Sequence, residues 1–269
     1  MKSKLANAQD NISAIKDIMI CPICSMALNI DAAAVKCANN HTFNISKKGL
    51  VNFASPLNDK IYNKELFTAR KIVLNSGIYD QVYKELIKLI KDNSIILDAG
   101  AGEGTYLDVI VREFSNVKTI GLDLAKAGLE IASDYQTASY FLADLANIPL
   151  ADNSLDYILN ILSPANYAEF DRILKNDGCL IKVIVNDNYL KEIRNAINKT
   201  EERNDNVYNN LAEQMDIISE SDITYEYPLD HDLATNLIKM TPMTNHIQEQ
   251  IFIDKITIDL KIIVARKKV

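Results

Sequence analysis

Residues 94–106 read Ser-Ile-Ile-Leu-Asp-Ala-Gly-Ala-Gly-Glu-Gly-Thr-Tyr, and this stretch decides the fold of the 269-residue chain. An apolar strand is predicted at Ile95–Leu97, it ends in Asp98, and a helical pattern opens at Glu103–Phe114. The turn between them contains three of the chain's eight glycines, Gly100, Gly102 and Gly104. Such a turn lets the backbone approach a ligand closely where a Cβ would clash, so it predicts a ligand site after the strand.

The spacing of this turn indicates the kind of ligand. The glycines follow a G-x-G-x-G pattern with Asp98 two residues ahead, whereas the dinucleotide fingerprint is G-x-G-x-x-G. An uncompensated carboxylate would repel a pyrophosphate and attract a ligand that bears an ammonium group. S-adenosylmethionine carries an ammonium group and a cationic sulfonium. The turn therefore predicts an S-adenosylmethionine site that includes Asp98, Gly100 and Gly104.

Acids also end the next two predicted strands. Val117–Leu122 ends in Asp123, nineteen residues beyond Gly104, and Ser139–Ala143 ends in Asp144. A parallel sheet would bring Asp123 to the ribose hydroxyls of the cofactor and Asp144 beside its adenine edge. The alternative is that these acids only cap the following helices, which explains one such acid better than three.

Strands and helices alternate from residue 94 onward, which implies parallel pairing with right-handed crossovers. Strands are predicted at 95–98, 118–122, 139–143, 155–162 and 178–186, and helices at 59–76, 79–92 and 230–239. The long alternating strands Ile223–Tyr227 and Ile251–Ala265 fit an antiparallel pair at the sheet edge. Residues 1–17 are expected to form a weak helix or a frayed tail, and residues 198–210 an exposed element.

Three of the four cysteines lie close together, and a histidine follows the last of them. Cys21, Cys24, Cys37 and His41 form a C-x2-C pattern, a twelve-residue spacer and a C-x3-H pattern. Each pair can point two ligands at one ion from a tight turn, which predicts tetrahedral zinc ligation. Four protein ligands leave no open position for water, so the predicted site is structural. Disulfides are the alternative, and the remaining Cys179 is predicted to lie in the core.

The charge of the chain is unevenly distributed. The net charge is −7, but the segment from Cys21 to Lys71 carries +4, which leaves −11 for the remainder. A basic module on an acidic body fits local contact with phosphate and disfavours wholesale coating of RNA. The sequence has neither a secretory signal nor an apolar run of about 18 residues, so a cytoplasmic protein is predicted.

Together these motifs resemble the RlmA family, the bacterial guanine-N1 methyltransferases of large-subunit ribosomal RNA. The zinc pattern followed by Leu97-Asp-Ala-Gly-Ala-Gly-Glu-Gly104 carries the resemblance, which extends over essentially the whole chain past residue 18. Further matching stretches are His41-Thr-Phe-Asn44, Lys48-Gly-Leu-Val-Asn-Phe53, Ala69-Arg70, Ser76-Gly-Ile-Tyr79, Ile161-Leu-Ser-Pro-Ala-Asn-Tyr167, Lys182-Val-Ile184 and Leu237-Ile-Lys-Met-Thr-Pro242. Ser163-Pro-Ala-Asn-Tyr167 and Leu190-Lys-Glu-Ile-Arg194 are most similar to the Gram-positive branch.

The resemblance implies an α/β fold of the Rossmann-like class I methyltransferase type, with a mostly parallel seven-stranded sheet and a small N-terminal zinc-binding domain. The implied domains are residues 1–57 (tail and zinc module), 58–92 (connecting helices) and 93–269 (methyltransferase). The implied reaction transfers a methyl group from S-adenosylmethionine to N1 of a guanine in hairpin 35 of domain II of 23S rRNA, near the macrolide-binding tunnel. This position links the reaction to macrolide resistance, and it is left open whether the methylation protects against an antibiotic or is a housekeeping step. The resemblance also places four residues around the cofactor: Tyr79, Gly102, Glu103 and Tyr189, the last a histidine in relatives. Homodimer formation is left open.

Methylation at N1 requires an acceptor for the N1 proton. The candidates are Asn160, Ser163 and the carbonyl group of Pro164, none of them a strong base, and the general base stays unassigned. The candidates for phosphate contact are Lys47, Lys48 and Arg70. Two alternatives remain: a small-molecule methyltransferase, since the same sheet serves many acceptors, and a non-catalytic zinc-containing RNA-binding relative, which the amide at position 160 motivates.

Overall fold

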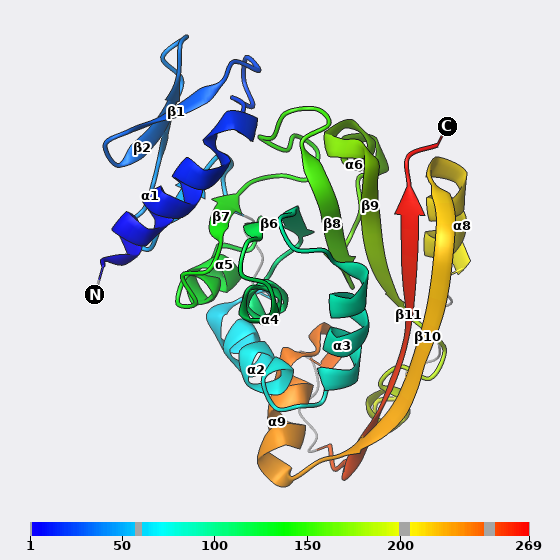
Figure 1. The fold of residues 1–269 in the computed structure, drawn as a ribbon. Helices are drawn as coiled ribbons and strands as arrows, with labels where there is room; N and C mark the ends of the chain where they lie inside the picture. Colours follow the sequence, from blue (N-terminus) through cyan, green and yellow to red (C-terminus); the bar gives the residue numbers. More distant parts are fainter. Residues whose placement is uncertain (1, 57–60, 199–204, 245–250, 269) are drawn as a thin grey trace.

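A mixed eight-stranded sheet forms the centre of the protein in the computed structural model, which describes residues 2–56, 61–198, 205–244 and 251–268 (Figure 1). The strands are β4 (Leu50–Asn52), β5 (Ile95–Ala99), β6 (Lys118–Asp123), β7 (Ser139–Leu142), β8 (Leu155–Ile161), β9 (Leu174–Val185), β10 (Asp216–Pro228) and β11 (Lys255–Arg266). They lie in the order β10-β11-β9-β8-β5-β6-β7-β4. The strands from β4 to β9 pair in parallel, and β11 pairs antiparallel with both β9 and β10.

The predicted α/β fold is confirmed, with one strand more than the seven expected. The strands predicted between residues 95 and 186 all form, and so does the antiparallel pair near the C-terminus. The additional strand is β4, which pairs in parallel with β7 and places Val51 opposite Phe141. Since its partner lies about ninety residues further along the chain, local periodicity does not reveal this pairing.

Helices cover both faces of the sheet (Figure 1). One face packs against α2 (Lys64–Leu74), α3 (Asp80–Leu89), α4 (Thr105–Glu113), α5 (Lys126–Ala132), α7 (Lys191–Ala196) and α9 (His231–Met240). The other face packs against α1 (Lys4–Ile15), α6 (Tyr167–Ile173) and α8 (Asp205–Gln214). In the described ranges, no helix combines the length and the apolar character needed to cross a membrane.

The predicted helices are shorter in the structure than in the sequence pattern. The helix predicted at 59–76 begins at Lys64, because the side chain of Asn63 caps it by accepting a hydrogen bond from the Leu66 amide at 3.0 Å. Of the segment expected to form a weak helix or a frayed tail, Lys4–Ile15 forms the helix α1. The exposed element predicted at 198–210 falls partly outside the described residues, and its end forms the start of α8.

A three-stranded antiparallel sheet forms the N-terminal module, from β1 (Leu28–Asp31), β2 (Ala34–Cys37) and β3 (Thr42–Asn44). The apolar side of this module is continuous with the core under the large sheet, because Val35 and Phe43 share one buried cluster with Leu97 and Phe141. We keep residues 57 and 92 as our proposal for the domain boundaries. The shared cluster implies that the zinc module and the methyltransferase domain stabilise one another.

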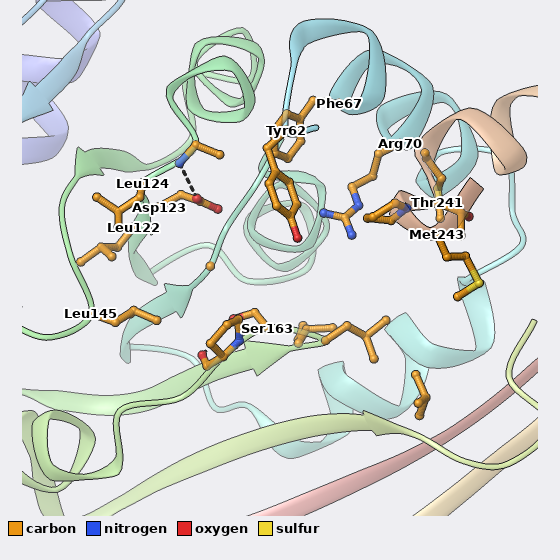
Figure 2. A pocket seen from close by; sticks show the side chains of 18 of the residues that line it. Tyr62, Phe67, Arg70, Leu122, Asp123, Leu124, Leu145, Ser163, Thr241 and Met243 are labelled. Atoms are coloured by element: carbon orange, nitrogen blue, oxygen red, sulfur yellow. Dashed lines mark hydrogen bonds between the residues drawn. The ribbon is translucent and has the colours of Figure 1, made fainter. Parts of the chain in front are cut away.

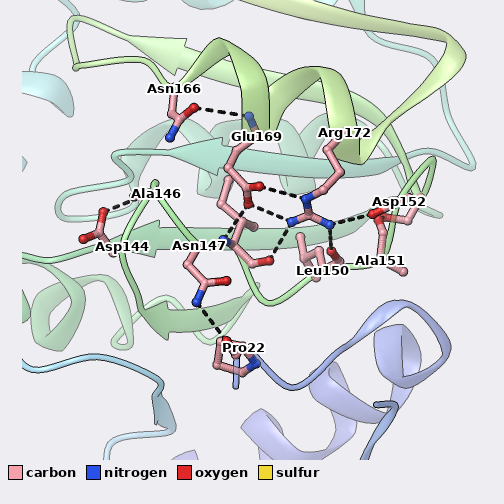
Figure 3. A network of polar contacts seen from close by, with 12 residues as sticks. Pro22, Asp144, Ala146, Asn147, Leu150, Ala151, Asp152, Asn166, Glu169 and Arg172 are labelled. Atoms are coloured by element: carbon pink, nitrogen blue, oxygen red, sulfur yellow. Dashed lines mark hydrogen bonds and ion pairs between the residues drawn. The ribbon is translucent and has the colours of Figure 1, made fainter. Parts of the chain in front are cut away.

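A charged network supports the loop on which the module rests (Figure 3). The guanidinium of Arg172 donates to Glu169 at 2.7 Å, to Asp152 at 2.9 Å and to two carbonyl groups of the loop between β7 and β8. In the same loop, Asn147 Nδ2 donates to the carbonyl group of Pro22 at 2.9 Å. Since Pro22 belongs to the Cys21–Cys24 turn, this contact joins the cysteine cluster to the large sheet.

Candidate cofactor cavity and metal centre

A cavity of about 510 Å³ opens at the carboxyl ends of the parallel strands, where β5 lies between β6 and β8 (Figure 2). This is a topological switch point: the strands that follow β5 in sequence lie first on one side of it (β6, β7) and then on the other (β8, β9). Open α/β sheets bind ligands at such points. The volume falls in the range of about 300–1,000 Å³ that small-molecule sites occupy. The lining residues are Tyr62, Phe67, Arg70, Gly100, Leu122–Ala125, Ala143–Leu145, Ile161–Pro164, Val185, Tyr189, Leu190 and Met240–Met243.

Asp98 and Glu103 line a recess that adjoins this cavity and shares Gly100 with it. Asp98 is only 2% exposed, and its Oδ2 atom has no hydrogen-bond partner among the described residues. Burial, reinforced by the carboxylates of Glu103 and Asp123, raises the pKa of Asp98 to about 8. Burial also raises the pKa of Glu103. Two buried acids, one of them with an unpartnered oxygen, form a site that a ligand's cationic group would stabilise.

The affinity for a ligand with an ammonium group is therefore expected to increase from about pH 6 to about pH 7.5. In the free protein Asp98 is mostly protonated over this range, so binding of a cation must release its proton, and affinity falls by up to about tenfold per pH unit on acidification. Isothermal titration calorimetry with S-adenosylhomocysteine, in buffers of different ionisation enthalpy, measures both the affinity and the released proton. A flat affinity across this range would contradict the assignment.

The two acids predicted for the ribose and the adenine both reach the cavity. Asp123 accepts hydrogen bonds from the backbone amides of Gly102 at 2.8 Å and Ala125 at 2.7 Å, so it also holds the glycine turn in place. Asp144 lines the same cavity and accepts from the Ala146 amide at 2.9 Å. The structure thus brings both carboxylates together, and their contacts with a nucleoside stay a prediction.

The two tyrosines that the resemblance placed at the cofactor meet in the recess. The hydroxyl groups of Tyr79 and Tyr189 lie 2.8 Å apart, although 110 residues separate them in sequence. Two further tyrosines on β10 hold the turn that leads into Tyr79, since Tyr225 donates to the Ile78 carbonyl group and Tyr227 to the Ser76 carbonyl group. The fold therefore supports Tyr79 from a strand that the sequence did not connect with the site.

The three glycines of the turn serve different purposes. Gly100 has a φ of +96°, lines the cavity and approaches Ser163 so closely that a Cβ would overlap that side chain. Gly104 has a φ of +82°, and a Cβ there would lie 2.8 Å from that of Ala132 on α5, so it allows close packing of the helices. Gly102 and Gly104 line neither the cavity nor the recess. Of the three glycines, Gly100 is the one that lines the cavity, and the cofactor contacts of Gly102 and Gly104 stay a prediction.

The loop after β8 is held from behind by a buried amide and a buried amine. Asn160 is fully buried, and its Nδ2 atom donates to the Ala99 carbonyl group at 2.9 Å, to Ser163 Oγ at 2.8 Å and to the Pro164 carbonyl group at 2.9 Å. Lys182, only 3% exposed, donates to the Asn160 side chain and to the Ser163 carbonyl group, and burial lowers its pKa to about 8.

Asn160 is therefore a supporting residue and does not line the cavity, whereas Ser163 and Pro164 do. The sequence analysis missed Lys182 as part of this support. A single cation within the apolar run Leu180–Val185 was the available signal, since a buried lysine needs polar partners.

The three candidates for phosphate contact lie in different environments. Lys47 is exposed on the module, and Lys48 forms an ion pair with Glu130 on α5 at 2.7 Å. Arg70 instead points into the cavity from α2, next to Phe67 and Tyr62 (Figure 2). The sequence analysis missed these two aromatic residues, although aromatic side chains on an amphipathic helix were visible in the pattern.

The four predicted metal ligands converge on one point. Their ligand atoms all lie within 4.8 Å of one another, with His41 Nδ1 at 3.5 Å from the Sγ atoms of both Cys21 and Cys37, and Cys24 Sγ at 3.7 Å from Cys37 Sγ. A tetrahedral zinc ion with bonds of about 2.3 Å to sulfur and about 2.1 Å to nitrogen requires separations of this size. A backbone hydrogen bond from Met26 lowers the pKa of Cys24 to about 6, which favours the thiolate that binds metal.

Two stretches of the chain match models of protein families. Residues 19–60 match the model of the RlmA N-terminal domain, which is a zinc ribbon, and residues 96–178 match a methyltransferase domain. The first match contains all four metal ligands. The second contains the glycine turn and the ends of β6, β7 and β8. The metal centre and much of the cavity wall thus lie in separate matched regions.

Whole-chain similarity extends further. YxjB of Bacillus subtilis, named as a 23S rRNA (guanine-N1)-methyltransferase, is 34% identical over 244 residues, or 83% of this chain and 85% of that protein. The 23S rRNA (guanine(748)-N1)-methyltransferase of Streptomyces fradiae is 27% identical over 239 residues, or 84% and 85%. A crystal structure of phosphoethanolamine N-methyltransferase 2 from Haemonchus contortus shares the fold, with a TM-score of 0.54 at 13% identity over 79% of this chain and 60% of that one.

Proposed function

The chain belongs to the RlmA family of 23S rRNA (guanine-N1)-methyltransferases, and from this membership we propose that it methylates a guanine in hairpin 35 of domain II, near the macrolide-binding tunnel. It is an S-adenosylmethionine-dependent rRNA methyltransferase with one structural zinc ion. The Streptomyces fradiae relative is named for guanine 748, which makes that position the first to test. We further propose that the protein acts in the cytoplasm, where its rRNA substrate is made.

One observation carries the proposal: a single chain combines the Cys3His cluster with a cavity whose adjoining recess contains the unpartnered, buried oxygen of Asp98. The acids of the recess fit the ammonium group at the amino acid end of the cofactor, and the zinc module adds a basic segment that a small substrate would not require. This combination favours rRNA over a small-molecule acceptor. The buried amide at Asn160 does not favour a non-catalytic protein, because Asn160 does not line the cavity.

S-adenosylmethionine, when bound, supplies the methyl group from its sulfonium. We propose that Asp98 and Glu103 hold the ammonium group of the cofactor, that Asp123 binds the ribose and that Asp144 lies beside the adenine. Tyr79 and Tyr189 would close the recess around the amino acid end. These roles are supported by the position of each side chain on the cavity or on the adjoining recess.

The acceptor base would lie against the loop after β8. Guanine N1 is hidden in a base pair, so the base must leave its stack or already be unpaired. Ser163 Oγ donates its one proton to the Ala99 carbonyl group at 2.7 Å and accepts from Asn160 Nδ2 at 2.8 Å, which leaves one lone pair of the hydroxyl group for a ligand. We therefore propose that Ser163 orients the guanine by accepting a hydrogen bond, and that the N1 proton passes to water.

Lys47 and Lys48 are proposed to contact the phosphates of the hairpin. Lys47 is exposed, and Lys48 lies on the same turn between β3 and β4, at the junction of the module and the large sheet. Its ion pair with Glu130 lies at the surface, where such pairs contribute little stability and can exchange for a phosphate.

Recombinant protein is expected to transfer labelled methyl groups to 23S rRNA transcripts and to stop primer extension one nucleotide before a guanine in hairpin 35. N1-methylation removes the Watson–Crick donor, so reverse transcriptase halts there. A transcript with adenine at that position is the matched control, and rRNA from cells with and without the gene extends the test. A stop in another hairpin would refute the site, and label found only in a metabolite extract would refute rRNA as the substrate.

A further inference from the structure

Arg70 is a cation inside the cavity, and the part of the chain that the structure describes offers it no polar partner. It lines both the main cavity and the recess that contains Tyr79, Asp98 and Glu103. Figure 2 shows its guanidinium directed into the open space. Among the described residues its side chain takes part in no hydrogen bond and no ion pair, and its one directional contact is with the Phe67 ring, 6.0 Å from the guanidinium carbon to the ring centre.

A guanidinium in this position requires an anion. It remains charged at any pH a protein tolerates and presents five N–H donors in a fixed fork. Leaving such donors unpaired in a partly enclosed site is unfavourable, and the nearby acids Asp98 and Glu103 do not come close enough to pair with it. The missing partner must therefore be an anionic group of a ligand.

Among the described residues, the recess thus presents one cation without a polar partner and one acid with an unpartnered oxygen. Arg70 faces it from α2, and the free oxygen of Asp98 faces it from the end of β5. An α-amino acid end group carries an ammonium and a carboxylate on a single carbon, and it is the ligand chemistry that satisfies both. The geometry points to Arg70 as the residue that binds the carboxylate of the cofactor's methionine end, opposite Asp98.

An RNA phosphate is the other source of an anion, and it fits this site less well. A phosphodiester would enter a recess that contains two carboxylates without bringing a positive charge of its own. The cofactor brings an ammonium group together with its carboxylate. This inference rests on the use of S-adenosylmethionine and is independent of which guanine is methylated, because its test requires no RNA.

The test compares two ligands in calorimetric titrations of the zinc-loaded, full-length protein. S-adenosylhomocysteine contains the carboxylate, and its decarboxylated analogue, S-adenosyl-3-thiopropylamine, retains only the amine. Arg70→Gln is expected to lower the affinity for S-adenosylhomocysteine by about 10- to 100-fold, which is the effect of losing a charge-assisted pair. It should lower the affinity for the decarboxylated analogue by less than about threefold. Arg70→Lys should lie between Arg70→Gln and the wild type, because it retains charge without the fork.

Lys64→Gln is the matched control, since it removes one charge from an exposed position on the same helix and should leave both affinities unchanged. Thermal unfolding and zinc content show whether each variant is folded. Equal weakening of both ligands by Arg70→Gln would overturn the inference, and so would unchanged affinity for S-adenosylhomocysteine. If the affinity for S-adenosylhomocysteine is unchanged, the binding of a hairpin 35 transcript is compared next. Weaker binding by Arg70→Gln than by wild type, with a smaller salt dependence, would assign Arg70 to an RNA phosphate. A wild-type protein that binds neither ligand would instead contradict its use of the cofactor.

Discussion

Cys24→Ser is expected to release the zinc ion and to lower the free energy of unfolding by about 3 kcal/mol or more. Structural zinc contributes a large part of the folding free energy of a module this small. The loss should extend beyond the module, because Val35 and Phe43 share a buried cluster with Leu97 and Phe141 of the large sheet. For a chain of this size the midpoint of thermal unfolding should fall by roughly 6–12 °C.

Calorimetric melting and metal analysis by mass spectrometry measure both effects, and chelation of the wild-type protein should reproduce them. Cys179→Ser is the control, since Cys179 lies outside the cluster and should retain one zinc per chain. Below its melting temperature Cys24→Ser should still bind S-adenosylhomocysteine within about threefold of wild type, because no metal ligand lines the cavity. A variant that keeps its zinc and its melting temperature would refute the metal centre.

Asp98→Asn is expected to lower the affinity for S-adenosylhomocysteine at least about 100-fold. At alkaline pH it is also expected to raise the free energy of unfolding of the ligand-free protein. The substitution preserves the shape of the side chain and removes the charge that the ligand's ammonium group requires. The pKa of Asp98 is raised from 3.8 to about 8 by folding, so the native protein binds a proton that the unfolded chain does not. Wild-type stability therefore falls between about pH 4 and pH 8, with a slope approaching 1.4 kcal/mol per pH unit.

Asparagine does not titrate, so the Asp98→Asn variant should exceed the wild type in stability above about pH 8 and lose this advantage near pH 4. Urea unfolding at both pH values measures the difference. Asp92→Asn is a control in which the free energy of unfolding should change in the opposite direction. Hydrogen bonds from Asn116 hold the pKa of exposed Asp92 below its usual range, so its charged form stabilises the folded protein. That variant should lose stability and keep its ligand affinity. If Asp98→Asn bound the ligand as well as wild type, the cofactor site would be wrong.

Both chemical centres could be predicted because their residues are close together in sequence. The zinc ligands fall within residues 21–41, and the acid and glycines of the turn within residues 98–104. Over such short spans, spacing alone determines which side chains can meet. The alternation of strands and helices predicted the parallel sheet for the same reason, since each element follows from local periodicity.

Two of the incomplete assignments involve partners far apart in sequence. Asn160 was considered for catalysis, but Lys182 from the neighbouring strand contributes to its burial behind the loop. Residues 1–57 were assigned to the tail and zinc module, but strand β4 within this range extends the large sheet through pairing with β7. A local pattern can mark such a residue but does not reveal its partner, because each contact depends on which strands become neighbours.

The amino-acid sequence by itself determined what this protein can bind: a zinc ion through three thiolates and an imidazole, and a cationic cofactor beside an acid and a glycine turn. Only the tertiary structure decided how these capacities are used. Packing of α2 over the ends of the strands turned Arg70 from an expected RNA contact into part of the cavity wall. The same packing excluded water from Asp98, and this exclusion raises its pKa and prepares the site for a positive charge.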